Sequence, residues 1–235
     1  MKGEVIIACD FQSHKETLEF LDLFHDQKPF VKIGMEVFYG NGPDIVREIK
    51  DRGHRIFLDL KLHDIPNTVY KSMRKLAELD VDMVNVHAAG TIEMMAAARR
   101  ALDEKGSNAL LLAVTQLTST SEEVMRRELL IDHSMETTVR HYAANAKKAG
   151  CNGVVCSPLE VTSVIAECGE DFVTVTPGIR FASDEKGDQK RVTTPAGARK
   201  LGSTFIVVGR SITAAKDPVE AYLRASRDFE EGAED

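Results

Sequence analysis

Residues 56–68 of the chain read Ile-Phe-Leu-Asp-Leu-Lys-Leu-His-Asp-Ile-Pro-Asn-Thr. The stretch opens with a short apolar run at 56–60, and it leads into a segment at 68–79 whose apolar side chains recur at helical spacing. Charged residues gather where the predicted strand ends. A strand followed by a helix is the unit from which parallel sheets are built, and the rest of the chain repeats this unit.

Eight short runs rich in β-forming residues occur along the chain. They cover 5–9, 30–33, 56–60, 83–86, 109–114, 153–156, 172–175 and 205–208. The segments with helical patterns cover 16–24, 43–52, 68–79, 92–105, 135–149, 159–168, 195–201 and 218–229. Near-continuous apolar strands fit parallel strands that are covered on both faces. Eight such repeats favour a closed (β/α)8 (TIM) barrel, a single domain over 1–235, rather than an open doubly wound sheet.

The net charge and the apolar runs argue against a nucleic-acid-binding protein and a membrane protein. A formal net charge of -7 argues against a nucleic-acid surface, because binding to the phosphate backbone needs a basic field. No apolar run approaches the roughly 20 residues that span a bilayer, and the N-terminal run lacks the length of a signal peptide. We therefore expect a soluble, cytoplasmic protein with no nucleic-acid or membrane partner. The four cysteines form no CxxC pair, which predicts reduced, buried thiols.

One segment departs from the alternation. Residues 177–194 are polar, charged and glycine-bearing, and they follow the seventh predicted strand. A loop of this length in a compact domain is usually functional or disordered, and barrel active sites gather at the carboxyl ends of the strands. We interpret residues about 178–194 as a lid that grips phosphate; the alternative is an inert mobile loop.

Five charged residues lie in or just after three consecutive predicted strands. Asp59 and Lys61 are two positions apart, so their side chains point to the same side of a strand. Asp64 comes after the turn, Lys32 lies near the end of the second strand, and Asp10 follows the first. Each charge alone fits an ordinary strand-end ion pair, but together they predict a preorganised field of alternating charges. A fixed ammonium stabilises a carbanion and then protonates it, while a fixed carboxylate favours loss of a neighbouring substrate carboxylate as CO2.

A phosphate site is predicted at the ends of the last two strands. Gly209 leaves backbone amides accessible after the eighth strand, and the loops after strands seven and eight commonly bind phosphate in such barrels. Arg180 and Arg210 add forked donors suited to phosphate oxygens. The alternative interpretation is that the turn at 208–211 only ends the eighth strand and binds nothing.

The motif Asp59-x-Lys61-x-x-Asp64, followed by Ile-Pro-Asn-Thr at 65–68, resembles the signature of the orotidine 5′-phosphate decarboxylases. The likeness extends over essentially the whole chain, and it is to the short bacterial form of these enzymes. Further matches lie in or after the other predicted strands, at Asp10, Lys32, Thr118, 177–180, Gln189, Gly209 and Arg210.

The resemblance implies a role for each matching residue. Lys61 would protonate C6 of the pyrimidine, within a catalytic network of Lys32, Asp59, Lys61 and Asp64. The substrate-binding residues that it implies are Asp10, Lys32, Asp59, Ile65, Thr68, Thr118, Pro177, Arg180, Gln189, Gly209 and Arg210. Among these, Asp10 and Lys32 would bind ribose, Thr118 the pyrimidine, and Gln189 both base and phosphate.

The resemblance also implies partners. Asp64, Ile65 and Thr68 would reach the site of a neighbouring copy, which implies a homodimer; orotidine 5′-monophosphate would be the substrate, with no metal and no organic cofactor. His63 and His87 lack the spacing of metal ligands. Two alternatives remain: a metal-dependent sugar-phosphate decarboxylase or synthase of the same barrel group, such as a 3-keto-gulonate 6-phosphate decarboxylase, and a non-catalytic nucleotide-binding barrel.

Overall fold

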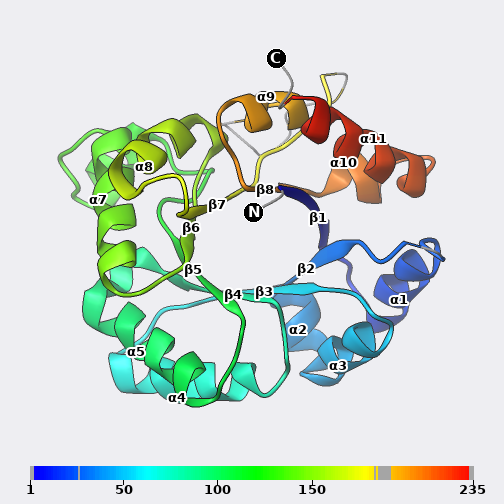
Figure 1. Cartoon of the computed structure of the whole chain (residues 1–235), viewed down its shortest axis with the longest axis horizontal. Coiled ribbons are helices and arrows are strands. Elements are labelled where there is room, and N and C mark those ends of the chain that lie inside the picture. Colours follow the sequence, from blue (N-terminus) through cyan, green and yellow to red (C-terminus); the bar gives the residue numbers. More distant parts are fainter. Residues whose placement is uncertain (1–2, 26, 183, 185–191, 233–235) are drawn as a thin grey trace.

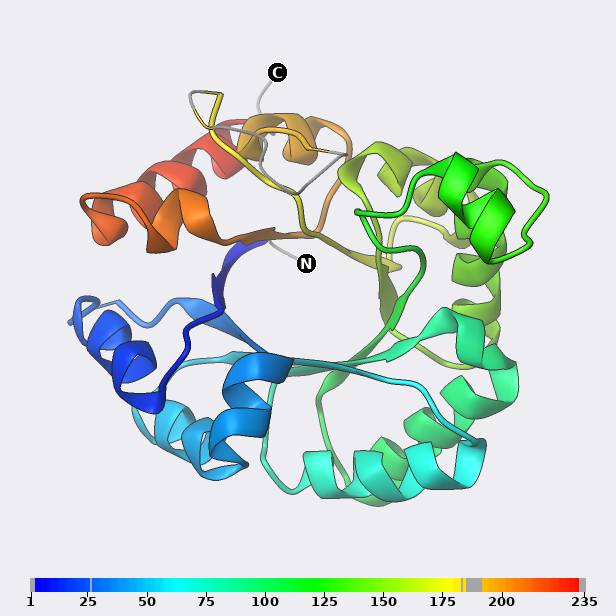
Figure 2. The same cartoon turned by 180° about the vertical axis from the view of Figure 1, so that it is seen from behind.

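Eight parallel strands close into a barrel in chain order, with β8 paired to β1, and helices surround it on the outside (Figures 1 and 2). This computed structural model describes residues 3–25, 27–182, 184 and 192–232. The strands are β1 Glu4–Cys9, β2 Phe30–Gly34, β3 Ile56–Leu62, β4 Met83–His87, β5 Leu110–Val114, β6 Gly153–Val155, β7 Val173–Thr176 and β8 Phe205–Val208. Each predicted strand is present, and the predicted (β/α)8 barrel is confirmed.

The helices lie in the connections between the strands and after β8. They are α1 His14–Asp22, α2 Met35–Asn41, α3 Asp44–Asp51, α4 Pro66–Ala77, α5 Thr91–Glu104, α6 Glu122–Glu128, α7 Met135–Lys148, α8 Val161–Cys168, α9 Pro195–Lys200, α10 Arg210–Thr213 and α11 Pro218–Glu231, with short 3-10 turns at Ala88–Gly90 and Pro158–Glu160. In the described part of the chain, none of them is long and apolar enough to cross a membrane.

Three short helices were not predicted from the sequence: α2, α6 and α10. Each buries a single side chain, namely Val37, Met125 and Ile212 respectively, so none carries the apolar stripe that marks a helix in sequence. Local capping supports α6 instead, since the Ser121 side chain accepts a hydrogen bond from the Val124 backbone N–H.

The barrel interior is a packed apolar core. Ile6, Phe30, Phe57, Met83 and Phe205 belong to one buried cluster, contributed by strands around the ring. The rings of Phe30 and Phe205 meet edge to face at 6.1 Å between centroids. This filled interior means that only the ends of the barrel are open to ligands.

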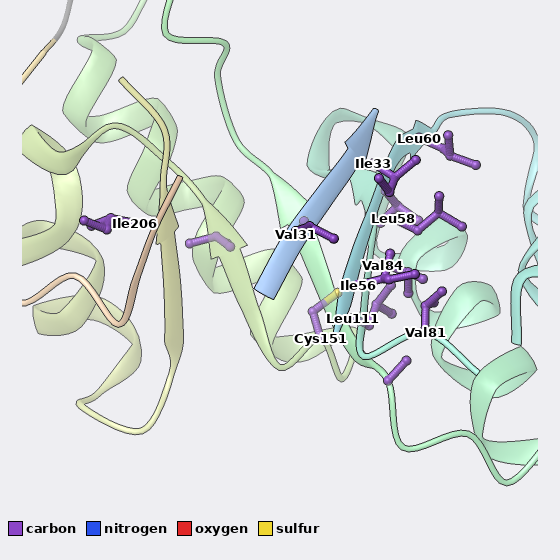
Figure 3. Packing of buried hydrophobic residues seen from close by; sticks show 14 of the residues in the cluster. Val31, Ile33, Ile56, Leu58, Leu60, Val81, Val84, Leu111, Cys151 and Ile206 are labelled. Carbon is purple, nitrogen blue, oxygen red and sulfur yellow. The ribbon is translucent and has the colours of Figure 1, made fainter. Parts of the chain in front are cut away.

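A second and larger apolar core lies between the barrel and its helices. Figure 3 shows Ile33, Leu58, Leu60 and Val84 packed together on one side of their strands. These positions alternate with the inward-facing ones, as expected for strands covered on both faces.

The four cysteines are buried thiols and not members of disulfides, as predicted. Burial raises the pKa of Cys9 and of Cys151 to about 12, so these thiols remain protonated and inert.

Candidate active site

The inward-facing positions of the strands lead directly to a charged site at the carboxyl end of the barrel. In β3, Phe57 belongs to the interior core, and the alternation of side chains brings Asp59 and Lys61 to the same face. In β2 the same alternation leads from Phe30 to Lys32. The site is therefore the continuation of the apolar interior, with charged residues replacing apolar ones where the strands end.

Ammonium and carboxylate groups alternate along this end of the barrel. Lys32 Nζ lies 2.8 Å from Asp10 Oδ1 and 3.6 Å from Asp59 Oδ2, and Lys61 Nζ donates to Asp59 Oδ1 at 2.7 Å. The side chains of Lys32 and Asp59 are 12% and 10% exposed, whereas that of Asp10 is 56% exposed. The predicted placement of Asp59 and Lys61 on one side is confirmed, and the network runs from the surface into the barrel.

These charges hold one another ionised. Burial alone would raise the pKa of Asp59, but the ammonium groups of Lys32 and Lys61, with hydrogen bonds from Lys61 and Asn85, outweigh burial and lower it. Burial alone would lower the pKa of Lys32, but Asp10 and Asp59 raise it above its ordinary value. The result is a preorganised field of fixed charges.

Strand β3 departs from regular geometry at its carboxyl end. Its pairing with β4 shifts register between Leu58 and Leu62, so that residues 59–61 stand opposite Asn85. Lys61 has a φ of 50°, in the left-handed region that non-glycine residues rarely adopt. The predicted strand end at residue 60 was therefore two residues too early: β3 continues through an irregular segment to Leu62.

A cavity of about 260 Å³ opens beside the network. Lys32, Asp59 and Lys61 line one part of it, and Thr118 and Pro177, both predicted from the sequence, line another. Phe57, Val114, Val155 and Val207 provide apolar walls. Charged groups facing an apolar pocket act in a low dielectric, which strengthens their effect on any group bound there.

A second cavity, of about 510 Å³, is lined by Arg180 and Arg210. Each arginine lies three positions beyond a residue that lines the first cavity, Pro177 and Val207 respectively, so the two cavities share the ends of β7 and β8. Burial and the positive charge of Arg210 lower the pKa of Arg180. The two arginines give this cavity forked donors of the kind that bind anions, and the carboxylates of Asp184 and Glu220 also line it. Gly209 precedes Arg210 at the start of α10.

The predicted lid is anchored at its base. Arg180 N donates to Thr193 O at 3.0 Å and Thr193 N donates to Gly178 O at 3.2 Å, so the two ends of the segment pair with each other. Gln189, the predicted base and phosphate contact, lies outside the described residues.

Asp64, Ile65 and Thr68 do not join the network of a single chain. Asp64 follows the end of β3, is exposed, and accepts a hydrogen bond from Ile65 N at 2.7 Å. Ile65 is 67% exposed and Thr68 is exposed in the first turn of α4. The prediction that Asp64 belongs to the charge network is therefore not met within one chain, because the loop after β3 leaves the strand alternation that directs Asp59 and Lys61 inward.

The histidines that were rejected as metal ligands lie next to each other. The rings of His63 and His87 are 5.5 Å apart between centroids. Burial, with the neighbouring imidazole of His63 and the ammonium of Lys61, lowers the pKa of His87. Over the described ranges, no three His, Cys, Asp or Glu side chains form a group able to hold a metal ion.

Sequence reasoning missed Asn85. It is 1% exposed, and it contacts both Asp59 and Lys61. The signal was present, because Asn85 is a polar residue inside the apolar run at 83–86 and shares the inward-facing parity of Met83.

The fold and the site together define a class: (β/α)8 barrels with a lysine–aspartate network beside a cavity lined by two arginines. The chain matches the model of the orotidine 5′-phosphate decarboxylase / HUMPS family over residues 3–225. It belongs to that family, and the resemblance drawn from its motifs is confirmed.

Individual relatives agree with this assignment. The chain is 54% identical over 232 residues to an orotidine 5′-phosphate decarboxylase of Fusobacterium nucleatum, covering 99% of this chain and 98% of the relative. It is 55% identical to the enzyme of that name from a Geobacillus strain, covering 97% and 98%. The crystal structure of the orotidine 5′-phosphate decarboxylase of Lactobacillus acidophilus superposes with a TM-score of 0.87 at 41% identity, covering 97% of this chain and 99% of that one.

Proposed function

We propose that this chain converts orotidine 5′-monophosphate to uridine 5′-monophosphate and CO2, in de novo pyrimidine biosynthesis. The observation that carries the proposal is the alternation of Lys32, Asp59 and Lys61 beside an apolar cavity. The names of relatives that are more than half identical over the full length support the same activity.

The reaction needs two things from the protein. The bond between C6 and the substrate carboxylate breaks, its electron pair stays on C6, and CO2 leaves as a neutral molecule. Asp59, held ionised, disfavours the substrate carboxylate in the ground state, and the Lys61 ammonium stabilises the C6 carbanion. Lys61 Nζ then gives its proton to C6 and regains one from solvent.

Binding groups surround this centre. Asp10 and Lys32 bind the ribose hydroxyls, Thr118 and Pro177 contact the pyrimidine, and the cavity of Arg180 and Arg210 takes the phosphate. Gly209 offers backbone amides to the same phosphate. The loop at about 178–194, with Gln189, closes over the bound nucleotide, so that phosphate binding energy contributes to catalysis at a distance.

A second copy of the chain completes the site. Asp64, Ile65 and Thr68 are exposed here and reach the network of the partner, which makes the active form a homodimer. Exposed apolar residues support such an interface: they follow the carboxyl ends of the neighbouring strands β2 to β5, at Met35, Tyr39, Ile65, Ile92 and Leu117.

The charge network weighs against the metal-dependent alternative. A cation bound by Asp59 would have to displace the ammonium of Lys61 at 2.7 Å, with Lys32 nearby at 3.6 Å. The chemistry of these residues supplies the charge stabilisation without a metal or organic cofactor. A biosynthetic enzyme acting on a nucleotide fits the cytoplasm, where we place it.

The variant Lys61→Ala should lose decarboxylation activity and keep nucleotide binding. The wild type is expected to consume orotidine 5′-monophosphate in a spectrophotometric assay, equally with and without a chelator. Lys61→Ala should lower kcat by at least about 10³-fold, since it loses both the charge and the proton donor. It should still bind uridine 5′-monophosphate in calorimetry, because the phosphate contacts remain.

The control is Lys148→Ala, which removes an exposed lysine at the end of α7 and should retain wild-type kcat. A wild type that does not turn over the substrate would contradict the proposal. Activity lost with the chelator would favour the metal-dependent alternative.

A further inference from the structure

Asn85 links the two charged residues of β3 through its side-chain amide. Its Oδ1 accepts a hydrogen bond from the Lys61 backbone N–H at 2.7 Å, and its Nδ2 donates to Asp59 Oδ1 at 2.6 Å. The partners fix the orientation of the amide, because a backbone N–H only donates and an ionised carboxylate only accepts. At 1% exposure, Asn85 is shielded from water that could replace either bond.

The first of these bonds acts on the backbone of the proton donor. The irregular pairing of β3 with β4 places residues 59–61 opposite Asn85, so the side-chain Oδ1 takes the place of a strand carbonyl for Lys61 N–H. Lys61 holds a φ of 50° there. A return of Lys61 to negative φ would turn its side chain relative to the peptide that Asn85 holds, and so away from Asp59.

The second bond acts on the carboxylate. Asp59 Oδ1 accepts from both Asn85 Nδ2 and Lys61 Nζ, at 2.6 and 2.7 Å, while Asp59 Oδ2 faces Lys32. Two donors on one oxygen fix the rotation of the carboxylate, and thereby the direction in which the Lys61 ammonium is held.

We propose that Asn85 is a positioning residue for the proposed decarboxylation, setting the place of the Lys61 ammonium through its backbone and through Asp59. The inference rests on the proposed role of Lys61 as proton donor to C6. Asn85 acts through Lys61 and Asp59 and not on the substrate. Its loss should therefore affect kcat far more than KM.

The first test is Asn85→Ala. With both bonds gone, kcat should fall by about 10²-fold, the usual cost of misplacing a catalytic group by about an ångström, while KM stays within about threefold. The matched control is Asn152→Ala: Asn152 Oδ1 also accepts from a strand N–H, that of Leu111 at 2.8 Å, but at the opposite end of the barrel. The control should lower Tm and leave kcat unchanged.

Asn85→Asp tests the same role by pH. The introduced carboxyl has the shape of the amide and accepts from Lys61 N–H in either form, but it donates to Asp59 only when protonated. The ammonium groups of Lys32 and Lys61 favour the ionised form of the introduced group, whereas burial and direct contact with the carboxylate of Asp59 favour its protonation. We expect burial and Asp59 to prevail, so that kcat relative to the wild type at the same pH rises at least about tenfold from about pH 8 to about pH 5. A purely structural role would give a constant ratio.

The results that would overturn the positioning role of Asn85 differ from those that would overturn the proposed function. A folded Asn85→Ala with kcat within about threefold of an active wild type, or a flat ratio for Asn85→Asp, overturns the positioning role alone. If Asn85→Ala does not fold, the pH ratio of Asn85→Asp decides. A wild type without turnover overturns the proposed function instead.

Discussion

At Lys61 the chain adopts a conformation that costs free energy. A non-glycine residue in the left-handed region costs about 1–3 kcal/mol, and it persists only where its surroundings fix it. Here the surroundings are the hydrogen bond from Lys61 N to Asn85 and the ion pair with Asp59. The strain therefore lies at the residue proposed to do the chemistry.

Asp59 should stabilise the folded protein in a pH-dependent way. Its pKa in the folded state lies below the unfolded value of about 3.9, so its stabilisation is present above that pH and is lost as the pH falls through the folded pKa. Near neutral pH, Asp59→Asn should lower the free energy of unfolding by about 3–5 kcal/mol, because two largely buried ammonium groups lose their shared counter-charge.

Urea unfolding of the wild type and of Asp59→Asn between about pH 7 and pH 3 measures this effect. The difference between their free energies of unfolding should shrink toward pH 3. Asp44→Asn is the control: this carboxylate is 85% exposed, and its pair with Arg47 contributes at most about 1 kcal/mol. A gap for Asp59→Asn that is independent of pH would contradict the linkage.

At the scale of elements, the pairing of β6 with β7 in the closed barrel brings the two backbones into close contact. Gly153 in β6 pairs with Val173 in β7, and a Cβ at Gly153 would lie 2.0 Å from the backbone oxygen of Val173. Glycine is therefore required at this position by contact with the neighbouring backbone and not by its own φ.

Gly153→Ala should separate the two strands at a cost of at least about 2 kcal/mol in the free energy of unfolding. Gly40→Ala is the matched control, because no atom lies within 4 Å of the added Cβ and the site is in helix α2. This control should be neutral or stabilise by up to about 1 kcal/mol. Equal melting temperatures for Gly153→Ala and the wild type would show that the strands have room for the methyl group.

At the scale of the whole molecule, the proposed homodimer should show complementation between inactive chains. If Lys61 and Asp64 of one site come from different chains, a mixed dimer of Lys61→Ala and Asp64→Ala has one site lacking both residues and one intact site. Random reassortment of equal amounts makes half of the dimers mixed, each with one intact site of two, and should restore about a quarter of wild-type activity.

Size-exclusion chromatography should give a dimer for both variants, and each alone should have little activity. If mixing restored nothing although the chains exchange, Asp64 would act within its own chain, or not at all.

Much of this architecture was predictable because it depends on local pattern. The eight apolar runs predict eight strands since burial on both faces requires them to be apolar throughout. Asp59 and Lys61 were placed together because alternation in a strand is local geometry. The helices α2, α6 and α10 were not predictable in this way, since each buries only one side chain.

The sequence by itself determined the barrel, the charges at the ends of β1 to β3, and the arginines after β7 and β8, because each depends on residues near one another in the chain. Only the tertiary structure decided the left-handed Lys61, the role of Asn85 opposite it and the exposure of Asp64. The physical reason is that these features arise where β3 meets β4. There the register shift, a property of two strands together, leaves a backbone N–H that a side chain more than twenty residues away must satisfy.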